Sequence, residues 1–215
     1  MRRVIDLTHP IAASMPVFPG DPPVDVRRVR VSADGDYEIS ELRMGTHTGT
    51  HIDAPAHCMP GGRGVDSIPL EVLVGPADVL DLGDRAAGSE IRAADLEPFA
   101  DRVRAGSRVL LRTGWGRRFS DPLFFRDFPG LAEDAAYWLT SRKVALVGLE
   151  QPSTHPKRHL EVHRTILSAG VVLVESMANL DRLTAERIYL IVLPLNVPGA
   201  EGAPVRAIAV EGVQI

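Results

Sequence analysis

Residues 45–57 read Gly-Thr-His-Thr-Gly-Thr-His-Ile-Asp-Ala-Pro-Ala-His, and this stretch concentrates metal-binding side chains. His47, His51, Asp53 and His57 lie within eleven consecutive positions. Imidazole nitrogen together with carboxylate oxygen favours zinc, manganese or iron over copper(I) or calcium. One isolated histidine would be interpreted as a structural or surface residue, but these residue types at this spacing predict a metal site.

The backbone of the same stretch is not typical of a helix. Gly45, Gly49 and Pro55 oppose regular helical structure, so the ligands are expected to converge from a strand end and a turn. In an extended segment, side chains alternate between faces with a period of two. We therefore expect His51 and Asp53 to point to the same face.

The segments around this stretch predict a mixed fold. Runs rich in β-branched residues predict strands at 4–7, 24–31, 38–44, 78–82, 108–112, 144–149, 171–175, 188–193 and 205–210. Helical patterns occur at 93–103, 131–142 and 159–169, the last closed by Gly170. The continuous apolar runs at 144–149 and 171–174 predict strands covered on both faces. Helix–strand alternation from 89 to 175 favours one mixed α/β domain over residues 1–215.

Composition limits the class of protein. The 215 residues are 45% hydrophobic and 24% charged, which is ordinary for a globular domain, and the formal net charge is -4. This charge argues against nucleic acid or an anionic membrane as the main partner. Cys58 is the single cysteine, which excludes a disulfide-stapled module. With no signal-peptide pattern and no apolar stretch of about 18 residues, we expect a cytoplasmic protein.

Two other histidine motifs are rejected as sites. His159 and His163 are four residues apart, but the glutamate between them is one position too late for a zinc-protease helix. We expect His155 and His159 to face solvent or lie at the rim of a pocket. Cys58 follows His57 directly, and neighbours in an extended chain point to opposite faces, so a buried, inert thiol is favoured over a nucleophile.

The segment from His47 to His57 resembles the signature of the metal-dependent cyclase/hydrolase family, which includes bacterial kynurenine formamidase (arylformamidase) and isatin hydrolase. The resemblance implies a swivelling β/β/α fold of the cyclase type, a single α/β domain with a barrel-like mixed sheet flanked by helices. It extends over nearly the whole chain, through residues 5–11, 15–23, 68–71, 75–77, 111–115, 152–153 and 174–180.

The resemblance also implies a ligand set. His47, His51 and Asp53 would hold one ion, with Asp53 bridging to a second ion. His163 and Glu175 match the later ligands of the family, and Glu175 would also be shared. A carboxylate that ends a buried apolar strand is costly without a cation or partner, which agrees with this assignment. A salt bridge between Glu175 and an arginine is the structural alternative. The implied cofactor is a divalent metal, Zn²⁺ with one or two ions per subunit, or Mn²⁺ as the alternative.

Two further positions follow from the resemblance. His57 matches the catalytic histidine of the family. Phe18 falls where the formamidases place a substrate-stacking aromatic residue, usually tryptophan, and a phenyl ring can also pack on an aniline ring. The segment 150–155 departs from the family, which more often carries aspartates around its Pro-Ser pair.

The function that this resemblance implies is hydrolysis of an amide bond. The leading hypothesis is N-formylkynurenine plus water giving kynurenine and formate, a step of tryptophan catabolism. Three alternatives stay open: a hydrolase of isatin or another cyclic amide or lactone, a biosynthetic ring-closing cyclase, and a non-catalytic, metal-stabilised binding protein. The expected partners are a small-molecule substrate and further copies of the chain, as a dimer or tetramer.

Overall fold

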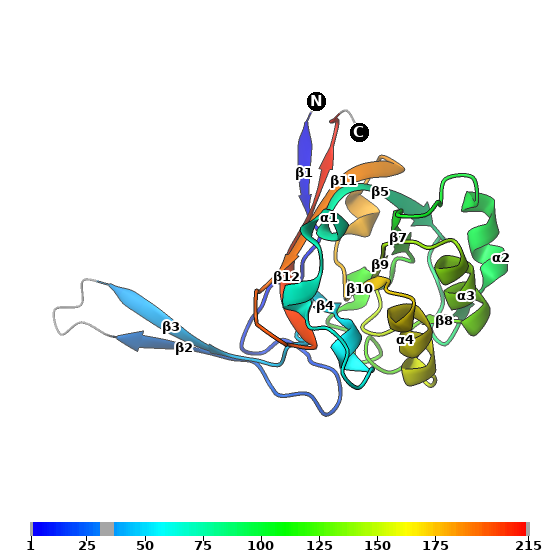
Figure 1. The fold of residues 1–215 in the computed structure, drawn as a ribbon. Coiled ribbons are helices and arrows are strands. Elements are labelled where there is room, and N and C mark those ends of the chain that lie inside the picture. The colour runs from blue at the N-terminus through cyan, green and yellow to red at the C-terminus, as the bar shows by residue number, and fades with distance from the viewer. Residues whose placement is uncertain (1, 31–36, 214–215) are drawn as a thin grey trace.

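The computed structural model describes residues 2–30 and 37–213, and its centre is a mixed sheet that closes into a barrel (Figure 1). Eight strands pair in the order β1-β12-β11-β5-β7-β9-β10-β4, and an additional β12–β4 pairing closes the seven strands from β12 to β4 into a ring, with β1 paired to β12 alone. The barrel-like mixed α/β sheet predicted above is therefore confirmed. Its strands are β1 Arg3–Asp6, β4 His51–Asp53, β5 Val74–Asp81, β7 Arg108–Arg112, β9 Leu146–Leu149, β10 Val172–Glu175, β11 Arg187–Pro194 and β12 Gly202–Glu211.

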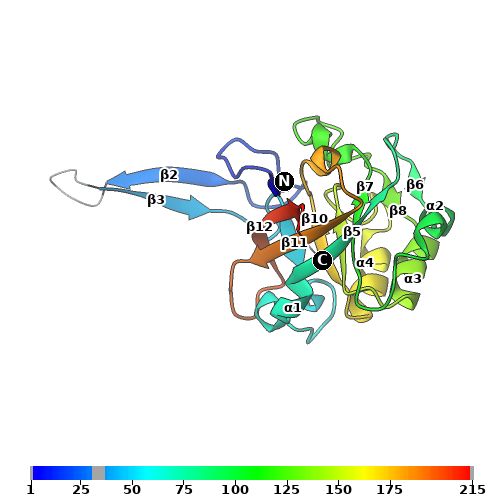
Figure 2. The ribbon, with the colours of Figure 1, turned by 90° about the horizontal axis from the view of Figure 1, so that it is seen from above.

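Strand direction divides the barrel into two parts. β5, β7, β9 and β10 are parallel neighbours, whereas β1, β12, β11 and β4 pair antiparallel. Parallel strands need crossover connections. Here the crossovers include α2 Ala93–Leu96, α3 Glu133–Ser141 and α4 His159–Ser168. Figures 1 and 2 show these three helices together on one side of the barrel.

The core consists of two main apolar layers that share the parallel strands. On β7, Leu110 belongs to the cluster inside the barrel, while Val109 and Leu111 belong to the cluster beneath the helices. β9 and β10 are buried along their whole length. Coverage of both faces explains why these strands are continuous apolar runs, as the sequence predicted.

A long hairpin projects away from the barrel (Figures 1 and 2). It consists of β2 Asp25–Arg30 and β3 Glu38–Arg43 in antiparallel register. The two strands were predicted, although Val31, the last residue of the first prediction, lies outside the described residues. We call β2 and β3 the arm.

Three short elements and several short helices complete the fold. α1 Leu70–Leu73 precedes β5, and β6 Glu90–Ile91 pairs with β8 Gly130–Leu131. The 3-10 segments are η1 Pro55–His57, η2 Val65–Ser67, η3 Glu97–Phe99, η4 Trp115–Arg118 and η5 Leu180–Arg182. No helix among the described residues is both long enough and apolar enough to span a bilayer.

Two predicted helices are shorter than expected. The helix predicted over 93–103 ends at Leu96 and continues as η3, because Pro98 cannot donate a backbone hydrogen bond within a regular helix. The helix predicted from residue 131 begins at Glu133, because Gly130 and Leu131 pair with β6 instead. The third ends as predicted, since Gly170 follows α4 with a left-handed φ of 77°.

Candidate metal centre

Strand alternation brings the first three candidate ligands to one face. β4 pairs with β10 so that His51 lies opposite Glu175 and Asp53 lies opposite Leu173. Ile52, between the two ligands, points into the barrel core. Since successive side chains alternate, His51, Asp53 and Glu175 all lie on the outer face of the barrel. This confirms that His51 and Asp53 share a face.

Helix α4 adds a fourth side chain to His51, Asp53 and Glu175. His163 is buried, and its Nε2 lies 3.3 Å from Asp53 Oδ2 and 3.2 Å from Glu175 Oε1. His51 Nε2 lies 3.3 Å from Asp53 Oδ1 and 3.6 Å from Glu175 Oε2. Two imidazole nitrogens, one from β4 and one from α4, therefore face the same pair of carboxylates.

His47 and His57 extend the cluster on its other side. His47 Nδ1 lies 2.8 Å from Asp53 Oδ1, and the His47 and His57 rings are 4.2 Å apart between centroids. Two groups of potential ligand atoms result, each within 4.8 Å of one another: His47, Asp53 and His57 in one, and His51, Asp53 and Glu175 in the other. Asp53 belongs to both groups. The group with His47 contains His57, which the family resemblance assigns as the catalytic residue and not as a ligand.

The orientation of two imidazoles is set by backbone carbonyl groups. His51 Nδ1 is 2.9 Å from the Gly49 oxygen, and His163 Nδ1 is 2.7 Å from the His159 oxygen. A carbonyl oxygen can only accept, so each Nδ1 donates, and each Nε2 is left facing the carboxylates. This second contact on the far ring nitrogen is typical of metal-ligating histidine.

The centre has the polar atoms that a cation would satisfy. Asp53 is fully buried, yet neither of its oxygens has a hydrogen-bond partner, and Glu175 Oε1, His163 Nε2 and His47 Nε2 are also buried and unpartnered. Buried polar atoms without partners are rare and costly. The alternative partner for Glu175, an arginine, is absent among the described residues, where its ionic neighbours are His51 and His163. The nitrogen and oxygen donors fit a divalent metal ion.

The pKa values of Asp53 and Glu175 shift in opposite directions. Burial alone would raise the pKa of Asp53, but the close imidazoles of His163, His47 and His51 hold it well below its usual value. Burial and the negative charge of Asp53 raise the pKa of Glu175. Two adjacent carboxylates cannot both ionise freely without positive charge nearby. The site therefore favours a cation electrostatically.

The pKa values of His51 and His57 also shift in opposite directions. Burial opposes protonation of His51, but its contact with Asp53 and the charges of Asp53 and Glu175 raise its pKa to about 9. Burial and, to a smaller extent, the neighbouring histidines lower the pKa of His57 to about 4, against the opposing charge of Asp53. At neutral pH His57 is therefore a neutral imidazole that can accept a proton.

A cavity of about 410 Å³ opens onto this cluster. Phe18 lines it as expected, and Phe125, which the sequence did not indicate, packs edge-to-face on Phe18 with ring centroids 6.2 Å apart. Within the described residues, no lysine or arginine lines the cavity. Its remaining lining is Pro19, Gly20, Asp21, His47, His51, His57, Pro152, Ser153, His159, His163, Glu175 and Ser176.

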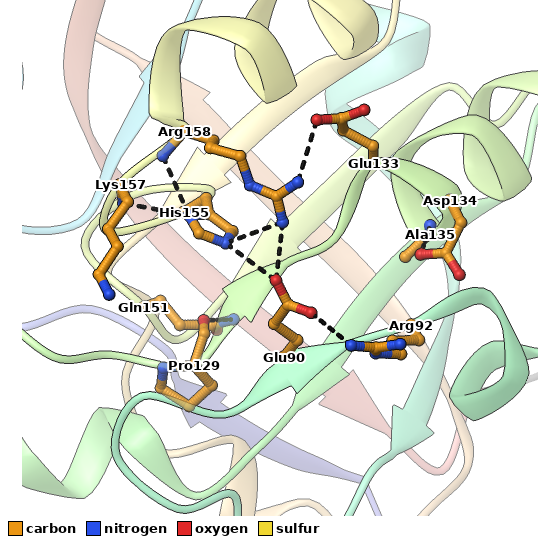
Figure 3. Close-up of polar contacts among 10 residues, drawn as sticks. All are labelled: Glu90, Arg92, Pro129, Glu133, Asp134, Ala135, Gln151, His155, Lys157 and Arg158. Carbon is orange, nitrogen blue, oxygen red and sulfur yellow. Dashed lines mark hydrogen bonds and ion pairs between the residues drawn. The ribbon is translucent and has the colours of Figure 1, made fainter.

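Three other expectations about side chains need correction or completion. His159 does line the cavity, but His155 is 6% exposed and lies in a separate polar network behind α4 (Figure 3). Gln151 is fully buried and donates from Nε2 to the Pro129 oxygen, away from the cavity lining. Cys58 is half-buried rather than buried, and burial raises the pKa of its thiol, which disfavours the reactive thiolate.

Comparisons with known proteins agree with this geometry. Residues 5–156 match the Cyclase family model, described as "Putative cyclase". The chain is 34% identical over 211 residues to a kynurenine formamidase from Bordetella petrii, covering 97% of this chain and 98% of that protein. It is 28% identical to isatin hydrolase A from Ralstonia solanacearum, with a TM-score of 0.84 over 97% of this chain and 92% of that one. An isatin hydrolase bound to the product analogue thioisatinate is 25% identical, with a TM-score of 0.88 over 99% and 93% of the chains.

Proposed function

The chain belongs to the Cyclase family and is a hydrolytic enzyme, and from this membership we propose that it cleaves the amide bond of N-formylkynurenine to give kynurenine and formate. The observation that carries the proposal is the buried cluster of unpartnered ligand atoms at the base of the cavity. The identity over nearly the full length to a kynurenine formamidase supports the choice of substrate.

We assign the ligands from the two groups that share Asp53. His51, Asp53, Glu175 and His163 would hold one divalent ion, and His47 with Asp53 would contribute to a second position. Zn²⁺ is the proposed ion and Mn²⁺ the alternative, because imidazole and carboxylate ligands suit both. When bound, such an ion supplies Lewis-acid chemistry, acidifying water and polarising a carbonyl group.

His57 is the proposed catalytic residue. It lies at the cavity beside His47, and its neutral imidazole is free to accept a proton from the attacking water and return it to the leaving nitrogen. General acid–base catalysis of this kind contributes about 10²–10⁴-fold in rate. The ring's position at the cavity, beside the ligand cluster, supports this role over a purely structural one.

Phe18 and Phe125 are the proposed contacts for the aromatic part of the substrate. They form one apolar wall of the cavity, and an anilide ring can stack on or pack edge-to-face against them. Ser153, Ser176 and Asp21 add polar atoms to the lining. The wall thus fixes the ring while the amide carbonyl points toward the ligand cluster.

A second candidate substrate is a neutral cyclic amide such as isatin. The cavity lining has no lysine or arginine in the described part of the chain, so a free amino-acid carboxylate would have no guanidinium or ammonium partner there. The likeness to isatin hydrolases supports the same candidate. Ring-closing cyclase activity and a non-catalytic binding role are the remaining alternatives.

The experiment is a substrate panel with purified, metal-loaded protein. Formate release from N-formyl-L-kynurenine, at a kcat/KM at least tenfold above that for isatin and for simple lactones, supports the proposal. Faster opening of isatin transfers the assignment to the second candidate. Absence of turnover on every amide and lactone, in protein that holds metal, would refute a hydrolytic role.

We also propose that the chain forms a homo-oligomer, a dimer or tetramer, through the arm. Val26, Val29, Ile39 and Leu42 are exposed on the arm, and a two-stranded ribbon is at best marginally stable alone. Apolar surface of this kind is typical of an interface, and a second copy is the proposed occupant. Light scattering on the wild type should give a multiple of the 23.3 kDa chain mass, and a monomer at micromolar concentration would contradict this. Location in the cytoplasm stays a prediction.

A further inference from the structure

His155 lies just before α4 in the chain and outside the cavity at the ligand cluster, and its ring accepts two backbone hydrogen bonds. Its Nδ1 receives the amide hydrogens of Lys157 and Arg158, each at 3.0 Å (Figure 3). The acceptor at residue i and the donors at i+2 and i+3 reproduce the pattern by which Asp, Asn and Ser side chains hold turns. His155 thereby holds the turn that leads into α4, whose N-terminus has no side-chain cap of its own.

The contacts of the two ring nitrogens determine which of them carries the proton. Nε2 lies 3.5 Å from Glu90 Oε1, and Arg158 joins the same carboxylate oxygen at 2.7 Å and continues to Glu133 at 3.0 Å (Figure 3). Because Nδ1 accepts two hydrogen bonds, the proton of the neutral ring must reside on Nε2, where it faces Glu90. Burial lowers the pKa of His155, which agrees with a neutral ring.

Packing leaves the ring little freedom. A side chain at Gly130 would come within 2.5 Å of the His155 ring, so β8 closes directly over it. The next residue of β8, Leu131, donates its amide to the Thr154 oxygen at 2.7 Å. Strand β8, paired with β6, therefore contacts both His155 and Thr154.

Thr154 connects this turn to the ligand cluster. Its Oγ1 lies 2.9 Å from His163 Nδ1 and 3.3 Å from the His159 oxygen, which itself accepts from His163 Nδ1 at 2.7 Å. These contacts leave His163 Nε2 directed toward Asp53 and Glu175. The orientation of His163 thus depends on the turn that His155 holds.

We propose that His155 is a positioning residue that acts as a hydrogen-bond acceptor for the 156–158 turn and thereby sets Thr154 against the ligand His163. The inference rests on the proposed metal centre. It also assigns a purpose to a histidine that is neither a proposed ligand nor part of the cavity at the ligand cluster. Position 155 requires a side chain that accepts hydrogen bonds, and it requires neither a positive charge nor an imidazole ring.

The test measures metal affinity by competition with a chromophoric chelator. His155→Ala should weaken Zn²⁺ binding about 10–100-fold, the usual effect of losing a contact that orients a ligand. His155→Asn keeps an acceptor oxygen and should restore affinity to within about threefold of wild type. Glu133→Gln, at the exposed end of the network, is the matched control and should bind like wild type.

A double-mutant cycle separates positioning from general destabilisation. Thr154→Val removes the hydroxyl contact to His163 without touching the turn, and adding His155→Ala to it should weaken binding little further. Amide hydrogen exchange at Lys157 and Arg158 reports on the turn in metal-free protein, so it remains readable if a variant binds no metal. Protection should be lost in His155→Ala and retained in His155→Asn.

Two outcomes would overturn the inference: wild-type affinity in His155→Ala, or an Asn variant as weak as the Ala variant. Fully additive effects of the Thr154 and His155 substitutions would also count against it. A wild-type chain that binds Zn²⁺ but cleaves no amide would refute the proposed function and leave this test valid.

Discussion

Asp53→Asn is the substitution that probes the metal centre most severely. Asp53 is fully buried, both of its oxygens lack hydrogen-bond partners, and it belongs to both groups of potential ligands. Asparagine has nearly the same shape but carries no negative charge and replaces one oxygen with an amide group that cannot bind a cation. The substitution should therefore remove metal binding at both positions while leaving the barrel intact.

The size of the effect follows from linkage between binding and folding. A ligand present at 100 times its dissociation constant stabilises the folded state by about 2.7 kcal/mol. For a chain of about 200 residues, each kcal/mol shifts Tm by about 2–4 °C, so the metal should raise the wild-type Tm by roughly 5–11 °C. If Asp53→Asn weakens affinity at least 100-fold, the remaining shift should be about 1–2 °C.

The assay is thermal unfolding of chelator-treated protein before and after Zn²⁺ addition. The shift between the two states is the relevant quantity, because Asp53→Asn also removes ionic contacts to His51 and His163 in the metal-free protein. Asp78→Asn is the matched control: Asp78 is also buried but faces Arg187, away from the centre, and its metal-induced shift should equal that of wild type. A full shift in Asp53→Asn would refute the reasoning.

Three other substitutions give separate predictions. His57→Ala should keep at least one bound ion but lower kcat by about 10²–10⁴-fold, measured by steady-state turnover; normal kcat would remove His57 from the mechanism. Phe18→Ala should raise KM about three- to tenfold with little change in kcat, because an aromatic contact contributes about 0.5–1.5 kcal/mol; an unchanged KM would place the substrate ring elsewhere. Burial lowers the pKa of His9, stacked on Phe119 at 3.9 Å, to about 4. The pKa of His9 is higher in the unfolded chain, so the unfolded chain takes up a proton first as the pH falls. The free energy of unfolding therefore keeps its full value at neutral pH and falls by about 3 kcal/mol between pH 6.5 and 4. His9→Phe should flatten that part of the denaturation profile, and an unchanged slope would exclude His9 as its source.

The first half of the candidate metal centre could be predicted because its potential ligands are close in sequence. His47, His51, Asp53 and His57 form a local pattern, and strand alternation correctly placed two of them on one face. The other ligands come from elements more than 100 residues away along the chain. Only the family resemblance indicated His163, together with the hint of a carboxylate ending the buried strand at Glu175.

The fold also could be predicted where the signal is local and not where it depends on distant contacts. The long strands and α4 carry clear periodicity, so their existence was predicted within a few residues. β4, β6, β8 and α1 have two to four residues each, too few for a period to be visible. Closure of the barrel depends on β4 pairing with β12, and no local pattern reveals such a distant contact.

The side chains that were misplaced depend on tertiary contacts. Phe125 reaches the cavity through an aromatic cluster whose members come from several segments, including Phe18 and Phe119. His155 was expected to face solvent or lie at the rim of a pocket, since histidine is often exposed or half-exposed. Its burial results from the turn that it holds and from β8, whose Gly130 leaves room for the ring.

The most direct test of a metal-dependent amide hydrolase is a titration that follows bound metal and turnover in one sample. Chelator-treated protein would receive increasing Zn²⁺, with metal per chain measured after desalting and formate release measured from N-formyl-L-kynurenine. The account predicts no activity in metal-free protein and a rate that rises in proportion to bound metal, saturating at one or two ions per chain. Full activity in protein without metal would contradict it.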